Sequence, residues 1–363
     1  MNRKILYFII VAITTLLSFG SCTSEPENEP DYNPGSNPGN NPSVNPPTTT
    51  SYDVYVVGYE TGNDSVAKYW KNGVGFELPQ GTYAHSIAIV NGDIYIAGGY
   101  KNSAKYWKNG QPVNLADGGA YLAEAHDIKI YNGDVYVSGM IEDKRHNTTS
   151  AAGMTRRPVY WKNGQVVDVG SYTSQGILRG EEKATHICFD DGSIYLYLSN
   201  INSRAVVYWR DGQRIACNTA PSRDIGVCMD VKNGDVHIAG ISITANVGQC
   251  VAYWKNTYYT AITDYTHYTS SFGNTYNVTD IEAYNNDVYI AGSDDAGNAT
   301  YWKNGKAVVL EGGSIAGAIK IADGNVFAAG GGRKTLNYWQ NGKVSKFNAT
   351  GDVTVTAMAV VKK

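Results

Sequence analysis

Five side chains able to bind metals or transfer protons stand near the start of short apolar segments: His85, His126, Asp127, His186 and Asp280. Imidazoles and carboxylates are the usual groups for both tasks. His85 and His126 occupy equivalent places, and the other three lie one position further along their segments. No short ligand motif of the His-Glu-x-x-His kind accompanies them. We therefore expect hydrogen-bonded polar groups without a metal or cofactor, and a metal site is the alternative.

Glycoside hydrolysis needs two carboxyl groups that face each other across the substrate. Asp127, Glu124, Asp280 and Glu181 are available in the sequence, but their spacing defines no pair. We therefore expect a binding module and not an enzyme. A propeller enzyme acting on polysaccharide, as a glycoside hydrolase or lyase, is one alternative. A structural subunit of an envelope complex is another.

Two insertions are rich in side chains that suit ligand contact, and a third insertion covers Ser171–Ala184. Met140–Pro158 is basic, which suits an acidic glycan or partner, and its candidate residues are Arg156 and Arg157. Asp264–Val278 is aromatic, and rings of this kind stack on sugars or anchor proteins. The aromatic candidates are Tyr265, His267, Tyr268, Phe272 and Tyr276. The alternatives are a solvated basic loop and an aromatic loop packed on its own strands.

The elements that position these residues are organised around a repeated Tyr-Trp-Lys-Asn-Gly stretch. Four copies are intact and three are variants, and together they contain all seven tryptophans. The copies begin at Tyr69, Tyr106, Tyr160, Tyr208, Tyr253, Tyr301 and Tyr338. Their spacing of 37 to 54 residues indicates a propeller or a solenoid. Each unit alternates short apolar runs with Asn-Gly pairs, which favour tight hairpins.

Each unit is therefore predicted to form four antiparallel strands, and seven such units form an all-β, seven-bladed β-propeller. The chain ends support this fold. The first unit opens at Asp53 on what is already a second strand, while Val353–Val361 is an extra first strand after the last unit. We expect the two ends to pair and close the ring, which removes an exposed edge.

The strand order separates the connections into two sets. Turns from first to second and from third to fourth strand lie on one face, which we call the tight-turn face. The remaining connections lie on the opposite face, the variable face, because all length variation falls there. First strands line the axis, so the histidines and aspartates should surround the channel mouth on the variable face. A site is expected on that face.

The blade pattern resembles two propeller families. Tyr-Trp stands where WD-repeat propellers place Trp-Asp at the end of a third strand, although the Asp and the Gly-His that opens such a repeat are absent. The Gly98-Gly99 and Gly330-Gly331 doublets resemble kelch repeats, but only two units carry them. The resemblance covers the architecture of residues 51–363 and implies no site residues. It implies that the tryptophans pack between blades.

The N-terminus predicts a lipid anchor. Residues 1–21 read as a signal peptide with Arg3 and Lys4 before the apolar stretch Ile5–Leu17. Phe19-Gly20-Ser21-Cys22 resembles a bacterial lipobox, which implies acylation of Cys22. Residues 22–50 then form the acylated Cys and a Pro/Asn/Gly-rich tether. The acidic residues after Cys22 resemble an export signal, so we expect an outer-membrane lipoprotein that faces outwards, with the periplasmic face as the alternative.

Net charge limits the partners that we expect, and the cysteines are considered separately. The net charge of −3 and the lack of a basic stripe exclude nucleic acid as an expected partner. We expect a monomer that contacts the membrane through its lipid and binds a glycan or an envelope protein. Cys188, Cys217, Cys228 and Cys250 are expected as buried thiols, with a Cys217–Cys250 disulfide as the alternative.

Overall fold

The computed structural model describes residues 51–62, 64–144, 154–169, 182–200, 205–218, 223–244, 247–265 and 276–363. The chain divides into two units, Met1–Thr49 and Thr50–Lys363, and every described residue belongs to the second. The predicted signal peptide, Cys22 and the tether lie outside the described residues. Within the described ranges, no helix is long and apolar enough to cross a membrane.

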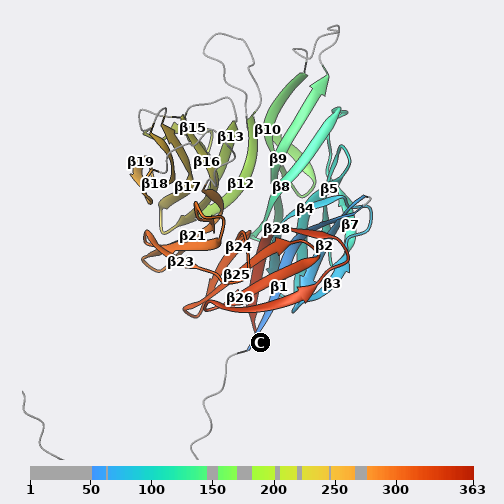
Figure 1. The fold of residues 1–363 in the computed structure, drawn as a ribbon. Helices are drawn as coiled ribbons and strands as arrows, with labels where there is room; N and C mark the ends of the chain where they lie inside the picture. Colours follow the sequence, from blue (N-terminus) through green and yellow to red (C-terminus); the bar gives the residue numbers. More distant parts are fainter. Residues whose placement is uncertain are drawn as a thin grey trace, which may run out of the picture. The chain divides into compact units, whose positions relative to one another are not determined.

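The described residues form seven four-stranded antiparallel sheets arranged as the blades of a ring (Figure 1). This confirms the predicted seven-bladed β-propeller. Blade 1 contains β28 (Asp352–Lys362), β1 (Tyr52–Thr61), β2 (Ser65–Lys71) and β3 (Val74–Glu77). Blade 2 contains β4 (Tyr83–Val90), β5 (Asp93–Tyr100), β6 (Ser103–Lys108) and β7 (Gln111–Asn114). Blade 3 contains β8 (Leu122–Tyr131), β9 (Asp134–Lys144), β10 (Met154–Lys162) and β11 (Gln165–Asp168).

The four remaining blades follow the same order. Blade 4 contains β12 (Glu182–Asp190), β13 (Ser193–Asn200), β14 (Val207–Arg210) and β15 (Gln213–Ala216). Blade 5 contains β16 (Arg223–Lys232), β17 (Asp235–Thr244), β18 (Gly248–Lys255) and β19 (Tyr258–Ala261). Blade 6 contains β20 (Asn277–Tyr284), β21 (Asp287–Ser293), β22 (Ala299–Lys303) and β23 (Lys306–Val309). Blade 7 contains β24 (Ala318–Ala322), β25 (Asn325–Gly332), β26 (Thr335–Gln340) and β27 (Lys343–Asn348).

The ring closes in blade 1 as the chain ends predicted. β28 pairs antiparallel with β1 along nearly its whole length, in the sheet order β28-β1-β2-β3. The backbone N–H of Lys363 donates to the carbonyl of Ser51 over 2.9 Å, so both ends of the propeller meet at the tight-turn face. The C-terminal strand therefore supplies the first strand that the N-terminal unit lacks.

The asparagine of the repeat holds each hairpin to the strand beside it. In blade 2, Asn109 and Gly110 both have positive φ, as a type I′ turn requires. The Asn109 side chain accepts a hydrogen bond from the N–H of Ile94 and donates one to Asp93, each over 2.8 Å. The same pair of bonds recurs at Asn72, Asn163, Asn256 and Asn304. The asparagine of the repeat therefore has a structural role in each of these hairpins.

The tryptophan of the repeat packs between blades, as expected. Trp107, Trp161, Trp254 and Trp339 are fully buried. The indole N–H of Trp107 donates to the carbonyl of Pro79, in the connection that follows the preceding blade, over 2.8 Å. Trp161, Trp254 and Trp339 make the equivalent bond. Each of these four rings thus contributes apolar burial and one bond across a junction. Trp209 is only half-buried.

The two faces differ as the sequence predicted. On the tight-turn face, thirteen connections between described strands have two residues each. On the variable face, connections have from two to 15 residues. The predicted loop Met140–Pro158 in blade 3 is too long. The strand β9 runs to Lys144 and β10 begins at Met154, both within the predicted loop. Glu142 and Arg156 face each other across this hairpin, and a cross-strand pair of opposite charges favours continued strands.

Candidate functional site

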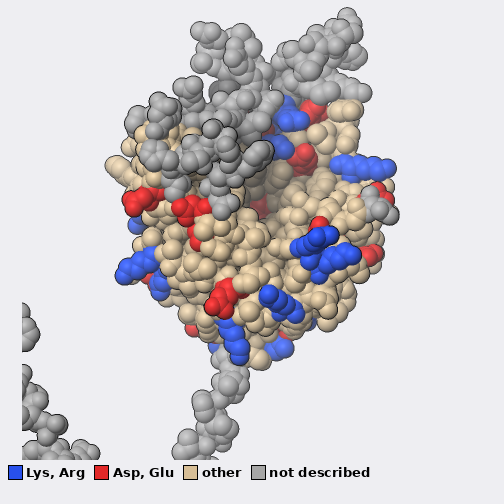
Figure 2. All heavy atoms as spheres, in the orientation of Figure 1, with Lys and Arg blue, Asp and Glu red and all other residues tan. Residues whose placement is uncertain are grey.

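The seven innermost strands line a narrow axial hollow. Its volume is about 130 Å³, and every one of β4, β8, β12, β16, β20, β24 and β28 contributes side chains. Figure 2 shows this side of the molecule hollowed at its centre, with basic and acidic side chains on the wall. The five histidine and aspartate candidates all line the hollow, so the sequence placed them on the right strands.

A β-bulge at the same place in six of the seven inner strands, all except β24, sets which side chains enter the hollow. His85 and His126 are the residues that the pairing with the neighbouring strand skips. Asp127, His186 and Asp280 are the first paired residues after the skip. A bulge adds one residue to one strand and redirects the side chains there. The equivalences that the sequence predicted therefore reflect a shared backbone feature.

Asp127 joins three blades and is 4% exposed. Its carboxylate accepts hydrogen bonds from the hydroxyl of Ser86 in blade 2, over 2.5 Å, and from the N–H of Ile187 in blade 4, over 3.0 Å. It also accepts from the N–H of Ile128 over 2.8 Å and from Lys129 over 3.0 Å. Burial opposes ionisation, but Lys129 and these donors lower the pKa of Asp127. The carboxylate therefore fixes neighbouring inner strands.

Two more carboxylates repeat this contact. Asp280 accepts from the N–H groups of Ile281 and of Ile319 in the next blade, over 2.9 and 3.0 Å. Asp230 accepts from the N–H of Ala283 in the next blade over 2.9 Å. Burial raises the pKa of Asp280. These acids are occupied by backbone donors, which is a structural task.

Sequence reasoning missed three charged residues that line the hollow, Lys129, Asp230 and Lys320. It also missed Glu282, the partner of Lys320. Lys320 makes an ion pair with Glu282 across blades 6 and 7. Burial raises the pKa of Glu282, although Lys320 opposes this. A signal was present, because Lys129 and Glu282 stand two residues after Asp127 and Asp280. The alternation of a strand places such residues on the same face.

A second polar cluster lies at the mouth, on the variable face. Lys183 donates to Glu124 over 2.7 Å, and Nε2 of His126 lies 3.2 Å from the same carboxylate oxygen. The rings of His85 and His126 are 5.3 Å apart, and that of Tyr83 is 5.0 Å from His85. Among the described residues, the buried Tyr83 hydroxyl has no hydrogen-bond partner. We call these five residues the mouth cluster.

Burial and neighbouring charges shift the pKa values of three groups in this region away from their usual ranges. Burial, assisted by His126, lowers the pKa of His85 to about 3. Burial also lowers the pKa of His186 to about 4, against the attraction of Asp127. Burial opposes ionisation of Glu124, but His126 and Lys183 lower its pKa to about 2. A general acid–base pair needs pKa values near the working pH, and these three groups lie far from neutrality.

The aromatic candidates have different surroundings. The Tyr265 hydroxyl lies 3.1 Å from that of Tyr259 and 3.4 Å from that of Ser242, at the variable-face end of blade 5. Tyr276 is buried, and its ring packs edge-on against Trp302 at 6.3 Å. The ring belongs to an apolar cluster that also contains Ile241 and Val251 of blade 5, so it is part of the contact between blades 5 and 6. His267, Tyr268 and Phe272 lie outside the described residues.

The basic candidates lie on β10. The Nε of Arg156 is 2.6 Å from Glu142, and Arg157 is 2.5 Å from Asp168. Both guanidinium groups are therefore partnered within blade 3. The two arginines are therefore members of ion pairs and not isolated cations.

Four of the five cysteines lie in the part of the chain that the structure describes. Cys188, Cys217, Cys228 and Cys250 are buried free thiols, as expected. Burial raises the pKa of Cys217 to about 12, so it is a poor nucleophile. Within the described ranges, no three His, Cys, Asp or Glu residues gather as a metal site.

Comparison with known proteins supports the fold. No family model and no curated protein matches the sequence. A puromycin-hydrolyzing peptidase from Mycobacterium tuberculosis is similar in structure, with a TM-score of 0.53 and 11% sequence identity. The match covers 83% of this chain and 53% of the peptidase, so the chain spans about half the length of that protein. At this identity, the likeness shows a shared fold and carries no activity over to this chain.

Proposed function

We propose that this chain is a non-catalytic binding module, held at the outer membrane through acylated Cys22, that recognises a glycan or a protein with its variable face. The observation that carries the proposal is the contrast between the two faces. Thirteen connections on one face have the two-residue minimum, whereas those on the other have up to 15 residues. Long connections in a compact repeat are uncommon unless they have a function.

The position of the chain ends supports the choice of face. Ser51, the first described residue, lies beside Lys363 at the tight-turn face. The residues that precede Ser51 are therefore joined to the propeller at the tight-turn face. Outward display at the cell surface would then present the long connections and the mouth cluster to a ligand.

The chemistry of the hollow supports binding over catalysis. Asp127, Asp230 and Asp280 are held by backbone donors from adjacent blades. The mouth cluster offers the partly exposed side chains of Lys183 and Glu124, which are suitable donors and acceptors for a polar ligand. Polar groups of this kind give orientation and specificity to a binding site. A polysaccharide-cleaving enzyme would need two of these acids released from their present bonds.

The experiment compares matched lysine variants on the two faces. Purified protein is tested on a glycan array and in pull-downs from envelope extracts. Lys183→Ala removes a cation of the mouth cluster and should weaken binding of the ligand that is found. Lys306→Ala removes an exposed cation at a tight turn and should leave binding unchanged. Equal binding by wild type and Lys183→Ala, with loss in Lys306→Ala, contradicts the proposal.

A further inference from the structure

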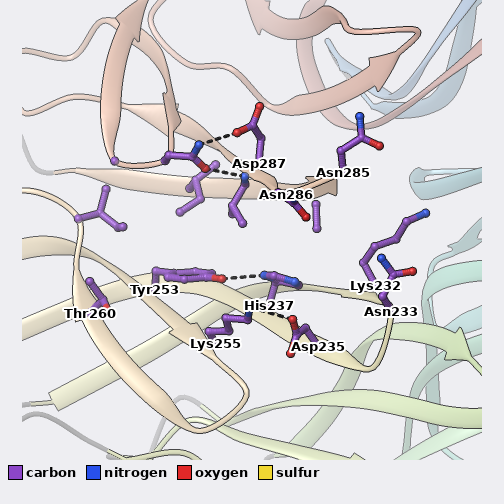
Figure 3. A pocket seen from close by; sticks show the side chains of 16 residues that line it. Lys232, Asn233, Asp235, His237, Tyr253, Lys255, Thr260, Asn285, Asn286 and Asp287 are labelled. Atoms are coloured by element: carbon purple, nitrogen blue, oxygen red, sulfur yellow. Dashed lines mark hydrogen bonds and ion pairs between the residues drawn. The ribbon is translucent and has the colours of Figure 1, made fainter.

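A cavity of about 540 Å³ opens on the tight-turn face, between blades 5 and 6 (Figure 3). It is larger than the axial hollow and lies away from the mouth cluster. The blade 5 wall includes His237, Tyr253 and Thr260, and the blade 6 wall includes Ala283 and Asn286. We call it the 5–6 cleft. A volume in the range of roughly 300–1,000 Å³ is typical of small-molecule sites.

The cleft exists because blade 5 departs from the repeat. His237 stands opposite the Lys255 of its Tyr-Trp-Lys stretch. The equivalent residue in the other six blades is a larger aromatic ring: Tyr55, Tyr95, Tyr136, Tyr195, Tyr289 and Phe327. At those junctions the ring fills the space against the next blade, as Tyr136 does against Phe189, with centroids 4.7 Å apart. An imidazole at position 237 fills less of this space.

The facing blade departs at the matching position. Ala283 pairs with Val288 at the end of its inner strand. The equivalent residues in the other blades are all larger: Ile89, Ile130, Phe189, Val231, Ile321 and Val360. At the junction of blades 5 and 6, both walls therefore carry a smaller side chain than the other junctions do, His237 on one wall and Ala283 on the other. Protein interiors normally fill such space, so a junction reduced on both sides is the expected place for a cleft.

The walls carry polar groups that match hydroxyl groups. A hydrogen bond of 2.7 Å joins Nδ1 of His237 to the Tyr253 hydroxyl. Thr260 faces Tyr253 across the sheet, where four of the other blades have Val or Ile. Asn286 occupies a turn position that is glycine in the other first-to-second-strand turns. Figure 3 shows Asn286 on one wall and His237 with Tyr253 on the other.

Two ion pairs neutralise most charges of the cleft, and the exposed side chain of Lys232 is a further cation on its lining, where solvent screens its charge. Lys255 is paired with Asp235 over 2.8 Å. On the facing blade, Asp287 is paired with Lys303 over 2.8 Å and accepts from the Asn304 side chain over 2.6 Å. These groups are thus neutralised within their own blades, and the field that they present to a ligand is weak. This arrangement suits an uncharged polar ligand better than a phosphate or a carboxylate.

We propose that the 5–6 cleft binds a neutral saccharide. The amides, hydroxyls and imidazole supply donors and acceptors for sugar hydroxyls, while Val288 and Ile290 on the blade 6 wall form an apolar floor for a ring face. Vicinal hydroxyls both donate and accept, as do Asn side chains and a neutral imidazole. The site is independent of the proposed variable-face ligand, because the two lie on opposite faces of the propeller.

The test measures saturation-transfer NMR from the purified protein to a panel of maltose, cellobiose, lactose and N,N′-diacetylchitobiose, with galacturonic acid as a charged comparison. Wild type should transfer saturation to at least one neutral disaccharide, and more strongly than to galacturonic acid. Ala283→Ile and His237→Tyr restore the residues of the other blades and fill the cleft. Each should weaken binding at least about tenfold, since the ligand then meets filled space.

Two further variants keep the result interpretable. Asn286→Gly changes an exposed turn residue to the glycine of the other turns, so the fold should be retained while affinity falls several-fold. Lys343→Ala, on blade 7, should leave binding unchanged. Thermal unfolding confirms that each variant is folded. The proposal is overturned if no neutral saccharide shows transfer, if galacturonic acid binds better, or if folded Ala283→Ile or Asn286→Gly binds as wild type does.

Discussion

Asp127→Asn tests whether the carboxylates of the hollow hold the blades together. The substitution keeps the shape of the side chain and replaces one acceptor oxygen with an N–H donor. Wild-type Asp127 accepts from Ile128 and from Ile187 through different oxygens. Whichever oxygen is replaced, one backbone N–H at the junction loses its acceptor and faces another donor.

The size of the effect follows from which contacts are buried. The Lys129 side chain is 42% exposed, so its pair with Asp127 should contribute less than about 1 kcal/mol. A lost bond to a charged acceptor and an unsatisfied buried donor together should cost about 3 kcal/mol. Asp127→Asn should therefore reduce the free energy of unfolding by about 3 kcal/mol, while Ser86→Ala should cost about 1 kcal/mol.

Urea titration of each variant gives these differences, provided that the slope of the transition is unchanged. Lys129→Met is the control for the ion pair and should cost less than about 1 kcal/mol. The reasoning is refuted if Asp127→Asn unfolds within 1 kcal/mol of wild type. It is also refuted if Lys129→Met costs as much as Asp127→Asn, because the ion pair would then outweigh the backbone bonds.

Three further predictions concern the anchor, the ring and acid stability. Cys22→Ser should abolish acyl labelling and release the protein from membranes, and a variant that still fractionates with the outer membrane contradicts the anchor. Deletion of Val353–Lys363 exposes the inner edge of β1 and should cost several kcal/mol, of the order of a domain's whole stability; an unchanged melting temperature argues against ring closure. Burial lowers the folded-state pKa of His186 to about 4. As the pH falls below about 6.5, the unfolded chain therefore takes up a proton before the folded protein does. The free energy of unfolding then declines by about 1.4 kcal/mol per pH unit, down to the folded-state pKa. His186→Gln should flatten this decline in urea titrations at several pH values, and an identical slope contradicts it.

The architecture was predictable because it is encoded locally and repeatedly. Asn109-Gly110 specifies a turn through positive φ, and the same signal recurs in most units. The N-terminal unit, which opens at Asp53, lacks a first strand, and Val353–Val361 is an extra first strand. Each could be completed only by the other, so ring closure was predictable. Strand periodicity also placed His85 and the other polar candidates on the inner strands.

The surroundings of the candidates were less predictable, because they depend on contacts between distant residues. Tyr276 has the composition of a loop anchor, but its ring packs on Trp302 of the adjacent strands. Arg156 looked like a free cation until the hairpin register placed Glu142 opposite it. Such partners are set by the register of pairing, which a single loop sequence does not contain.

The 5–6 cleft lay further beyond the reach of the sequence. His237 and Ala283 belong to different blades, and each is an ordinary residue for a strand. Their effect becomes visible only when all seven blades are superimposed by register and the two walls are placed face to face. A comparison of facing positions across blades is therefore the signal to look for in other repeat proteins of this kind.

Site-specific photocrosslinking in cells tests the central claim that the protein binds its ligand through the variable face. A photoreactive amino acid is placed at Tyr121, an exposed residue in a variable-face connection, or at Val74, an exposed residue beside a tight turn. Both positions are accessible, so they differ mainly in the face that they sample. A defined adduct from position 121 with none from position 74 is the predicted result, and an adduct from position 74 with none from position 121 would contradict the account.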